Sequence, residues 1–547
     1  MLIEKAKTYC VENKLFIFVI LLASFVRLIG LNWGYPFIFH PDEPTLIRGG
    51  TGIRFDPNPH HFDWPHLQTY LMFFVIALWA RFTDILEAVG LRGSLEQIVP
   101  LWWDRPFVFY FLGRLISALA GIGAVILTYI ISFDLFKKKS VAVLSSMLLV
   151  FSFQSIEDSH FATLDSSLTF WVLLSFLFSL KIVRTGNVKY YLLSGFLAGL
   201  ATSTKYNGAF VTFSIFASHI SYIVINNRKR IEILYSNKLL YSALALIGGF
   251  LLGTPYALLD YKTFFSTEPA IGALWQLSRQ STAFMERYLN FSLMEKNIRS
   301  NLFMSLSPFV LLFFFYGSLS LFTKNFKLKY LPLLIFGIGY LYYVSMFPVF
   351  YAQYFNPLYP FIAIISAWGV CQFTTDFNLK KVVFYLLLIF MFTPMILRVS
   401  DMMRVYLTDD NRIRAYSWIK QNVRAGETVA LAGSEKLEVE DISEDGLSGY
   451  VATSLMKEIN DIGKHKTESA IIQELVNRKV FYVVASDFDL QEQIENPYEP
   501  GFEYWSSGEW VVNNLWEVVR FVRRSPIEPT ISIRSTVHVD QDPIVIK

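Results

Sequence analysis

The sequence predicts a polytopic α-helical membrane protein with a small α/β domain at its C-terminus, and three observations support this. Of 547 residues, 53% are hydrophobic and 17% charged, whereas soluble globular proteins carry about 25% charged residues. Long apolar runs recur through residues 1–400 and shorten afterwards. Charge divides at the same place: residues 1–400 hold 32 Lys and Arg against 20 Asp and Glu, and residues 401–547 hold 16 against 25. These features argue against a cytosolic enzyme, a disordered protein and a nucleic-acid binder.

Membrane-crossing helices need about 20 mostly apolar residues. Eleven segments fit: 13–31, 107–134, 141–156, 164–182, 189–204, 207–225, 239–258, 302–322, 329–346, 355–373 and 381–398. A twelfth apolar stretch, 65–82, begins with Pro65 and His66 and carries Arg81. We expect it to be a short helix at the membrane surface or re-entering it.

The connecting charges support eleven crossings. With the N-terminus in the cytoplasm, the inward connections hold 18 basic residues against five acids, as the excess of Lys and Arg on the cytoplasmic side requires. Counting 65–82 as a crossing would place the KKK run at 137–139 outside. We therefore expect a multi-pass protein of the inner or plasma membrane, with the acidic C-terminal part outside the cytoplasm.

The first outward loop, 32–106, carries an acidic pair in FHPDEPTLIRGG (39–50). Pro41 and Pro44 stiffen the backbone around Asp42 and Glu43 by fixing φ. A carboxylate held near the interface is a candidate general base or cation ligand. A solvated acidic loop explains this segment alone equally well.

A second acidic cluster follows the third predicted span, in SIEDSHFATLD (155–165). Glu157, Asp158 and Asp165 surround His160 in this short outward connection. Ionisable residues at membrane depth are costly and usually functional. The two clusters are therefore predicted to line opposite walls of one cavity.

Basic residues at the outward ends of spans complete the predicted site. Arg114 lies in the first turns of the second span, and Lys205 follows the fifth. Both have a structural explanation, because long basic side chains extend to the interface. Carboxylates together with cations nevertheless suit a lipid-linked sugar phosphate, whose phosphate pairs with Arg or Lys while an acid activates the acceptor.

Histidines are concentrated in the same outward loops. The run of His60, His61 and His66 with Asp63 matches no dependable metal-ligand spacing. No cofactor is required on this reasoning, and a divalent cation (Mg²⁺, Mn²⁺ or Zn²⁺) is the alternative. The candidate substrate or metal contacts are His40, His61, His160, Tyr206 and Tyr354.

The order of these motifs resembles the GT-C glycosyltransferases that use polyprenyl-phosphate sugars, in the branch of the protein O-mannosyltransferases and aminoarabinose transferases. The motifs that carry the resemblance are, after the Asp-Glu pair, FDWPHLQTYLMFF (62–74), GRLISALAG (113–121), the second acidic loop, GLATSTKYNG (199–208), YAQYFNPLYPFIAI (351–364) and DNRIRAYSWIKQNV (410–423). The first loop is unusually rich in His, and no acceptor-recognition module is identified. The sugar and the acceptor, whether glycan, lipid or protein, stay open.

The resemblance implies a role for each cluster. Asp42 would be the catalytic acid or base with Glu43 beside it, and Asp158 or Glu157 would assist from the opposite loop. Arg114 and Lys205 would hold the donor phosphate. The reaction would be an inverting single displacement with an Asp base. Residues 1–400 would form the catalytic membrane domain.

Residues 401–547 are predicted to form the extracytoplasmic α/β domain. A helix over 410–423, strands over 427–433, 479–487 and 530–539, and a helix near 510–524 are expected. No catalytic constellation is found in it.

Two other functions compete with sugar transfer. A transporter or flippase would also place ionisable residues at membrane depth, but such sites usually lie near the bilayer midplane, whereas these charges lie at the outward edge. A noncatalytic membrane scaffold leaves both acidic clusters without a reason.

Overall fold

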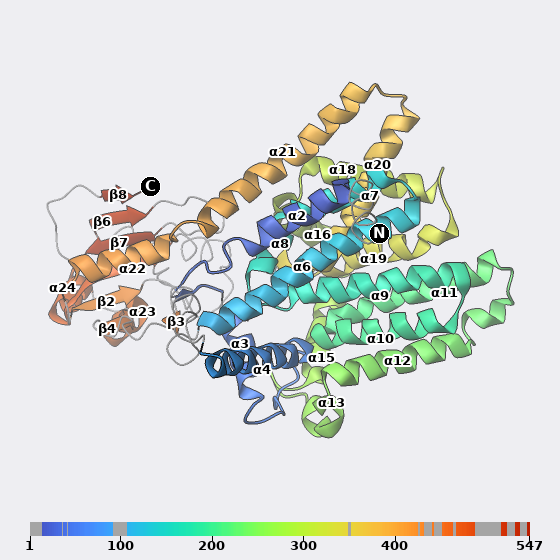
Figure 1. The fold of residues 1–547 in the computed structure, drawn as a ribbon. Helices are drawn as coiled ribbons and strands as arrows, with labels where there is room; N and C mark the ends of the chain where they lie inside the picture. Colours follow the sequence, from blue (N-terminus) through green and yellow to red (C-terminus); the bar gives the residue numbers. More distant parts are fainter. Residues whose placement is uncertain are drawn as a thin grey trace. The chain divides into compact units, whose positions relative to one another are not determined.

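The computed structural model describes residues 14–35, 37–40, 42–90, 107–347, 352–424, 427–431, 440–441, 451–462, 467–486, 516–521, 531–535 and 544–546. The chain divides into two compact units. The first comprises Met1–Leu31, Asp42–Val99 and Phe109–Val399, and the second comprises Asn32–Pro41, Pro100–Val108 and Ser400–Lys547. The first unit is a helical bundle, and the second contains a β-sheet (Figure 1).

Each of the eleven predicted spans contains a helix. These helices are α2 (Lys14–Leu28), α6 (Phe107–Phe136), α7 (Lys139–Val150), α9 (Asp165–Thr185), α10 (Val188–Thr204), α11 (Val211–Ile225), α12 (Asn237–Gly253), α18 (Pro308–Phe322), α19 (Leu331–Ser345), α20 (Tyr359–Asp376) and α21 (Lys381–Tyr406). By length and apolar composition, eight helices in the described part of the chain could cross a membrane, and ten if each of two bent pairs counts as one span. The polytopic helical fold is therefore confirmed.

Both bends fall within predicted spans, at 141–156 and 302–322. One joins α7 to α8 (Phe153–His160) with a bend of 57°, and the other joins Phe291–Ser305 to α18 with a bend of 114°. The remaining short helices are α3 (Asp42–Gly52), η1 (Tyr206–Phe210), η2 (Arg230–Ile233), α13 (Tyr256–Leu259), α14 (Tyr261–Phe264), α15 (Ala273–Arg287), α16 (Phe291–Asn297), η3 (Ile298–Leu302), α17 (Phe303–Ser305), η4 (Leu328–Tyr330) and η5 (Ala352–Leu358).

Helices α10 and α12 pack backbone against backbone. A Cβ atom added to Gly195 or Gly199 of α10 would clash with main-chain atoms of α12, and one added to Gly249 of α12 would clash with α10. Small residues allow helices to approach this closely. The glycine spacing in α10 therefore serves helix packing.

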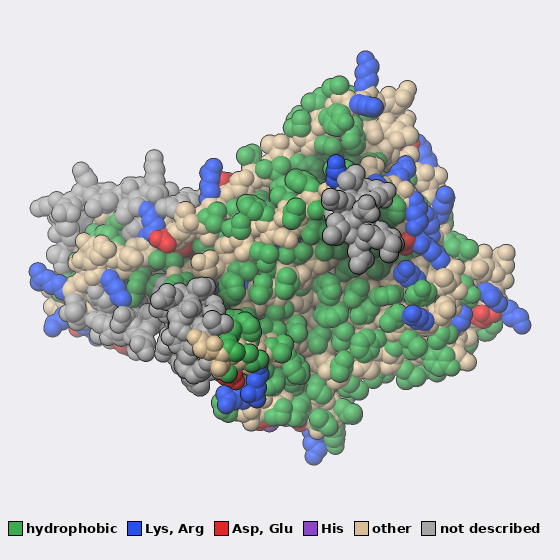
Figure 2. Space-filling model, in the orientation of Figure 1, with side chains coloured by type: hydrophobic (Ala, Val, Ile, Leu, Met, Phe, Trp, Pro, Cys, Tyr) green, Lys and Arg blue, Asp and Glu red, His purple; other side chains and the backbone are tan. Residues whose placement is uncertain are grey.

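The basic connections predicted to share one side of the membrane lie together. Asp134, near the end of α6, accepts hydrogen bonds from Lys137 at 2.8 Å and from Arg184 at 2.7 Å. Lys329 donates to the backbone oxygen of Leu135 at 2.6 Å. Figure 2 shows Lys and Arg side chains gathered at one end of the helices, with hydrophobic side chains along their flanks.

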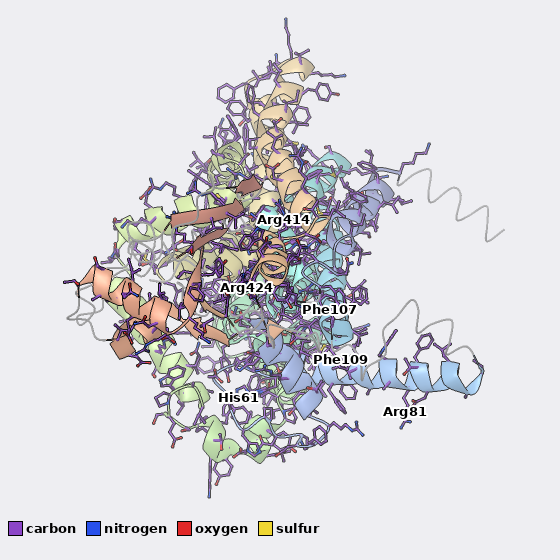
Figure 3. The ribbon with its side chains drawn as sticks, turned by 90° about the vertical axis from the view of Figure 1, so that its left-hand side faces the viewer. His61, Arg81, Phe107, Phe109, Arg414 and Arg424 are labelled. Carbon is purple, nitrogen blue, oxygen red and sulfur yellow. The ribbon has the colours of Figure 1, made fainter. Side chains whose placement is uncertain are left out.

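The apolar stretch predicted over 65–82 forms α4 (Leu67–Ala88), which is 22 residues long. The expectation of a short helix is therefore wrong, because the helix continues through Arg81 and Asp84, which pair at 3.5 Å on its exposed surface. The helices α6, α9, α10 and α12 run across the page in Figure 1, whereas α4, with Arg81, runs across the page in Figure 3, which is turned by 90°. Helix α4 thus lies across the direction of the bundle, although by length and apolar composition Leu67–Leu86 is one of the eight candidate spans.

The second unit contains a six-stranded mixed sheet in the order β4-β2-β5-β7-β6-β8. The strands are β2 (Thr428–Leu431), β4 (Val451–Ser454), β5 (Val480–Ser486), β6 (Trp516–Phe521), β7 (Ile531–Ser535) and β8 (Ile544–Ile546). β2 runs parallel to both β4 and β5, whereas β7 is antiparallel to β5 and β6. A separate two-stranded ladder pairs β1 (Phe37–Ile38) with β3 (Glu440–Asp441).

Alternating side chains of this sheet face two cores. Val429 and Val484 pack with Ile419 of α22 (Asn411–Asn422). Their neighbours Ala430 and Val483 pack on the other face, against α23 (Leu455–Ile462) and α24 (Glu468–Asn477). This two-residue alternation produces a three-layer α/β/α arrangement. The predicted small α/β fold is confirmed.

One predicted element of this unit is wrong. The helix expected near 510–524 is the strand β6, which pairs with β7 on one side and β8 on the other. Its consecutive β-branched residues Val518 and Val519 suit a strand, and Val519 is fully buried in the sheet core.

Candidate active site

A fully buried ion pair joins the first predicted acidic loop to helix α6. Glu43 lies in the first turn of α3, and its two carboxylate oxygens accept hydrogen bonds from Nε and Nη2 of Arg114 at 2.7 and 2.8 Å. Glu43 also accepts from the backbone N–H of Ala162 in the second loop at 2.8 Å, and Arg114 donates to the backbone oxygen of Leu31 at 3.0 Å. The side chains are 0% and 1% exposed. The two loops are therefore in contact at Glu43 and Ala162, and the polar atoms of Glu43 and Arg114 are used in holding them together.

The second ion pair remains partly open. Lys205 caps the C-terminus of α10, and its Nζ lies 2.8 Å from Oδ1 of Asp165 at the start of α9. Burial lowers the pKa of Lys205, but the carboxylates of Asp165 and Asp42 outweigh that effect and raise the pKa. Asp42 is exposed at the first residue of α3. Asp42 and Lys205, which the sequence assigned to acid–base and phosphate roles, thus belong to one electrostatic cluster.

Asp158 adds a third carboxylate to this cluster. It lies on α8 and interacts electrostatically with Asp165, Glu157 and Lys205. Gln154 donates to its Oδ1 at 2.8 Å, whereas its Oδ2 is buried without a hydrogen-bond partner among the described residues. Glu157 lies beside it, half-buried.

Arg27 holds the break between α7 and α8. Its guanidinium is fully buried and donates from Nη2 to the backbone oxygen of Leu149 at 3.1 Å and to Oγ of Ser155 at 3.3 Å. Its Nε and Nη1 have no hydrogen-bond partner in the described part of the chain. The residue lies in α2, and a Cβ on Gly121 would press on it. Arg27 therefore positions the helix that carries Asp158.

The predicted histidine contacts are dispersed. His160 is buried, with its ring nitrogens 2.9 Å from the backbone oxygens of Ile156 and Ile29. His61 bonds Asp63 at 2.8 Å, and His40 is half-buried in the second unit. Within the described ranges, no three His, Cys, Asp or Glu residues are grouped to hold a metal ion.

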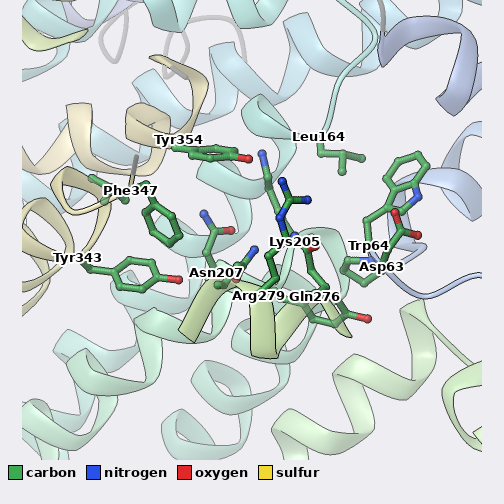
Figure 4. A pocket seen from close by; sticks show the side chains of 14 residues that line it. Asp63, Trp64, Leu164, Lys205, Asn207, Gln276, Arg279, Tyr343, Phe347 and Tyr354 are labelled. Atoms are coloured by element: carbon green, nitrogen blue, oxygen red, sulfur yellow. The ribbon is translucent and has the colours of Figure 1, made fainter. Parts of the chain in front are cut away.

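A cavity of about 310 Å³ opens next to Lys205 (Figure 4). It is lined by Asp63, Trp64, Pro65, Leu164, Lys205, Tyr206, Asn207, Gln276, Arg279, Gln280, Tyr343, Val344, Phe347 and Tyr354. Three of these, Lys205, Tyr206 and Tyr354, were candidates from the sequence. Lys205 lies 4.6 Å from the ring centroid of Tyr354, and Tyr206 donates from its hydroxyl to the backbone oxygen of Phe62 at 2.6 Å.

Sequence reasoning missed Arg279. This residue is exposed on α15, its guanidinium lies over the ring of Trp275 at 5.4 Å, and it has no carboxylate partner among the residues that the structure describes. The available signal was the amphipathic run ALWQLSRQ (273–280) between two spans. Arg114, by contrast, does not line the cavity.

Comparison with known proteins finds a family model that matches part of the chain. Residues 93–258 match the model of the dolichyl-phosphate-mannose-protein mannosyltransferases. The resemblance to the GT-C glycosyltransferases is confirmed. Together with the apolar helices, it supports a multi-pass membrane glycosyltransferase. No curated protein matches the sequence.

Several solved structures resemble the chain. The oligosaccharyltransferase of Archaeoglobus fulgidus has a TM-score of 0.46 at 13% identity, covering 86% of this chain and 68% of that one. ArnT of Cupriavidus metallidurans, bound to undecaprenyl phosphate, has a TM-score of 0.42 at 11% identity, covering 96% and 98%. The protein O-mannosyltransferase Pmt1–Pmt2 complex of S. cerevisiae, bound to the sugar donor, has a TM-score of 0.30 at 23% identity, covering 46% and 34%. No residue role in this chain follows from these similarities.

Proposed function

We propose that this protein transfers a sugar from a polyprenyl-phosphate donor to an acceptor hydroxyl on the outer face of the membrane. The observation that carries the proposal is the cavity lined by Lys205 and Arg279, with Lys205 also belonging to the carboxylate cluster. Two cations suit a phosphate, because hydrogen bonds between ionised groups are the stronger ones. A neighbouring carboxylate suits proton abstraction from an acceptor.

In the proposed reaction, the acceptor oxygen attacks the anomeric carbon while its proton passes to the carboxylate of Asp42. The bond between that carbon and the phosphate oxygen breaks, and the electron pair leaves with the polyprenyl phosphate. Lys205 and Arg279 stabilise the negative charge on this leaving group. One in-line displacement inverts the configuration at the sugar.

The other candidate residues take different roles in this proposal. Asp158 is the third acidic side chain of the cluster, and it acts on Lys205 and Asp165 through its electrostatic interaction with them. Glu43 and Arg114 hold α3 against the second loop, because their polar atoms are directed at each other. Neither is proposed to touch the donor.

No cofactor is included in the proposed reaction, and a divalent cation stays the alternative from the sequence. The reason is that the ammonium of Lys205 already lies among the carboxylates and can neutralise part of their charge. Transfer is therefore expected to persist after chelation with EDTA. A loss that added Mg²⁺, Mn²⁺ or Zn²⁺ restores would contradict this.

The decisive experiment measures release of polyprenyl phosphate from donors carrying mannose, glucose or aminoarabinose, with membrane extract as the source of acceptor. Asp42→Asn should lower the rate by about 10²–10⁴-fold, the usual contribution of general acid–base catalysis. The matched control is Asp56→Asn, since Asp56 is an exposed carboxylate of the same loop, paired with His60 at 2.8 Å. Full activity of folded Asp42→Asn would remove Asp42 from the mechanism, and wild type inert toward every donor would contradict the proposed function.

A further inference from the structure

The cavity has two chemically different ends (Figure 4). One end is aromatic: the rings of Tyr343 and Phe347 are 5.1 Å apart, and those of Phe347 and Tyr354 are 6.1 Å apart. The opposite end is formed by Asp63 and Trp64, just before α4. In the figure, Lys205 and Arg279 lie between the two ends.

The polar end is held in place by a histidine. Nδ1 of His61 lies 2.8 Å from Oδ1 of Asp63, and the rings of His61 and Trp64 stack at a centroid distance of 5.7 Å with an interplanar angle of 28°. Oδ2 of Asp63 has no hydrogen-bond partner among the described residues. The end therefore presents an oriented carboxylate oxygen and an indole side by side.

This combination matches a sugar ring. An ionised carboxylate only accepts hydrogen bonds, and a sugar carries several hydroxyl donors. The C–H face of a pyranose packs against the large apolar surface of an indole. The side-chain amides of Gln276 and Gln280 line the same cavity and can both donate and accept.

The opposite orientation is disfavoured by desolvation. An isoprenoid chain at the Asp63–Trp64 end would cover a carboxylate oxygen with hydrocarbon and leave it without a hydrogen-bond partner, which is costly. At the aromatic end, the same chain would meet Tyr343, Phe347 and Tyr354, whose rings offer apolar surface. The isoprenoid chain is therefore expected at the aromatic end of the cavity, and the sugar at the Asp63–Trp64 end.

We propose that Asp63 and Trp64 form the sugar subsite and that the polyprenyl chain leaves past Tyr343 and Phe347. This inference rests on the proposed function, because it places the donor phosphate between Lys205 and Arg279. It also defines the substrate class. A neutral sugar or an amino sugar fits beside Asp63, whereas a uronic acid would bring a second carboxylate against it, and like charges at this distance repel.

Two lipids distinguish this inference from the proposed function. The probes are undecaprenyl phosphate and undecaprenyl phosphate carrying mannose, whose binding to the full-length protein in detergent is measured by titration. Asp63→Asn and Trp64→Ala should weaken binding of the mannose lipid about tenfold, as the loss of one good polar or stacking contact predicts. Binding of the sugar-free lipid should stay within about twofold of wild type, which also shows that the variants are folded.

The matched control for Asp63→Asn is Asp56→Asn. Both carboxylates bond a histidine of the same loop at 2.8 Å, but Asp56 does not line the cavity. The control should bind both lipids as wild type does. Equal weakening of both lipids by Asp63→Asn and Trp64→Ala, or no weakening of either, would overturn the sugar subsite.

Lys205→Ala and Arg279→Ala test the underlying assignment separately, because they should weaken both lipids. If they leave both unchanged, the phosphate site and the proposed function fail together, whatever Asp63 and Trp64 do. A third probe, the lipid carrying glucuronic acid, should bind wild type more weakly than the mannose lipid. Asp63→Asn should reduce that difference, and an unchanged difference would contradict the charge argument.

Discussion

The two ion pairs of the candidate site, Glu43–Arg114 and Asp165–Lys205, differ in what they leave exposed. Glu43 and Arg114 are 0% and 1% exposed, and each end of the pair makes a further hydrogen bond to backbone. Asp165 and Lys205 are 7% and 23% exposed, and Lys205 borders a cavity. The separations are almost equal, at 2.7 and 2.8 Å. Pairing alone therefore does not tell a structural charge from one available to a substrate.

The chemistry of the two cations fits this division. A guanidinium presents a planar fork that binds a carboxylate in two places, which suits a permanent buried link. An ammonium is a compact charge on a flexible stem, so Lys205 can contact Asp165 and a bound phosphate in turn. The following four predictions separate residues that stabilise the fold from residues that are proposed to act on a substrate, in order of expected effect.

The largest effect is expected from breaking the buried pair. Arg114→Ala should lower the free energy of unfolding by about 3–5 kcal/mol, because Glu43 is left as an uncompensated buried charge. Unfolding in detergent measures this change. The double variant Glu43→Met with Arg114→Met should recover most of the loss, since apolar side chains of similar volume can replace a buried pair. A single variant as stable as wild type would contradict the structural role.

Removing the open cation should affect activity rather than folding. Lys205→Ala should slow transfer by about 10²-fold, as loss of one group that stabilises developing charge does. Stability should fall by less than the loss of about 3–5 kcal/mol expected for Arg114→Ala, because Lys205 is 23% exposed and water can reach the site. Lys189→Ala, at the exposed opposite end of α10, is the matched control. Should Lys205→Ala unfold the protein as Arg114→Ala does, the contrast between the pairs disappears.

Arg27 tests whether a buried cation that has no acid partner among the described residues can still influence the chemistry. Arg27→Met removes the hydrogen bonds to Leu149 and Ser155 at the α7–α8 break. We expect kcat to fall about tenfold with the donor KM unchanged, because the loss of about 1–1.5 kcal/mol of hydrogen bonding shifts α8 and its carboxylates. Arg81→Met, on the exposed surface of α4, is the control. A raised KM with normal kcat would point to donor binding instead.

The smallest effect concerns His66. Burial lowers its pKa to about 3, helped by the nearby His61. The folded protein thus keeps this ring neutral while the unfolded chain takes up a proton below about pH 6.5. Stability should therefore fall with pH, by about 0.7 kcal/mol between pH 7 and pH 6. His66→Asn should remove that loss and His60→Asn should keep it, which thermal unfolding at the two pH values can show.

The sequence correctly predicted those features that leave a local pattern along the chain. Apolar length located the helices, and the shorter apolar runs after residue 400 located β2, β5 and β7. Lys205 was found because a lone cation follows a span. The partner of Arg114 was not accessible, since it depends on how α6 is rotated towards α3. Arg279 was missed because its cavity is assembled from segments far apart in sequence, and β6 was mistaken for a helix because its sheet partners β7 and β8 follow it in the chain.

The glycine contact between α10 and α12 also limits where Lys205 can be. When two helices pack through long side chains, one helix can shift slightly because the side chains can change rotamer. Helices α10 and α12 are in direct backbone contact at Gly195, Gly199 and Gly249, where no side chain can adjust. Helix α10 is therefore held in a fixed position, with Lys205 at its C-terminal end. Only the flexible side chain of Lys205 can then adjust its distance to a bound phosphate. In the proposed reaction, the packing of α10 on α12 would therefore fix where the leaving phosphate is held.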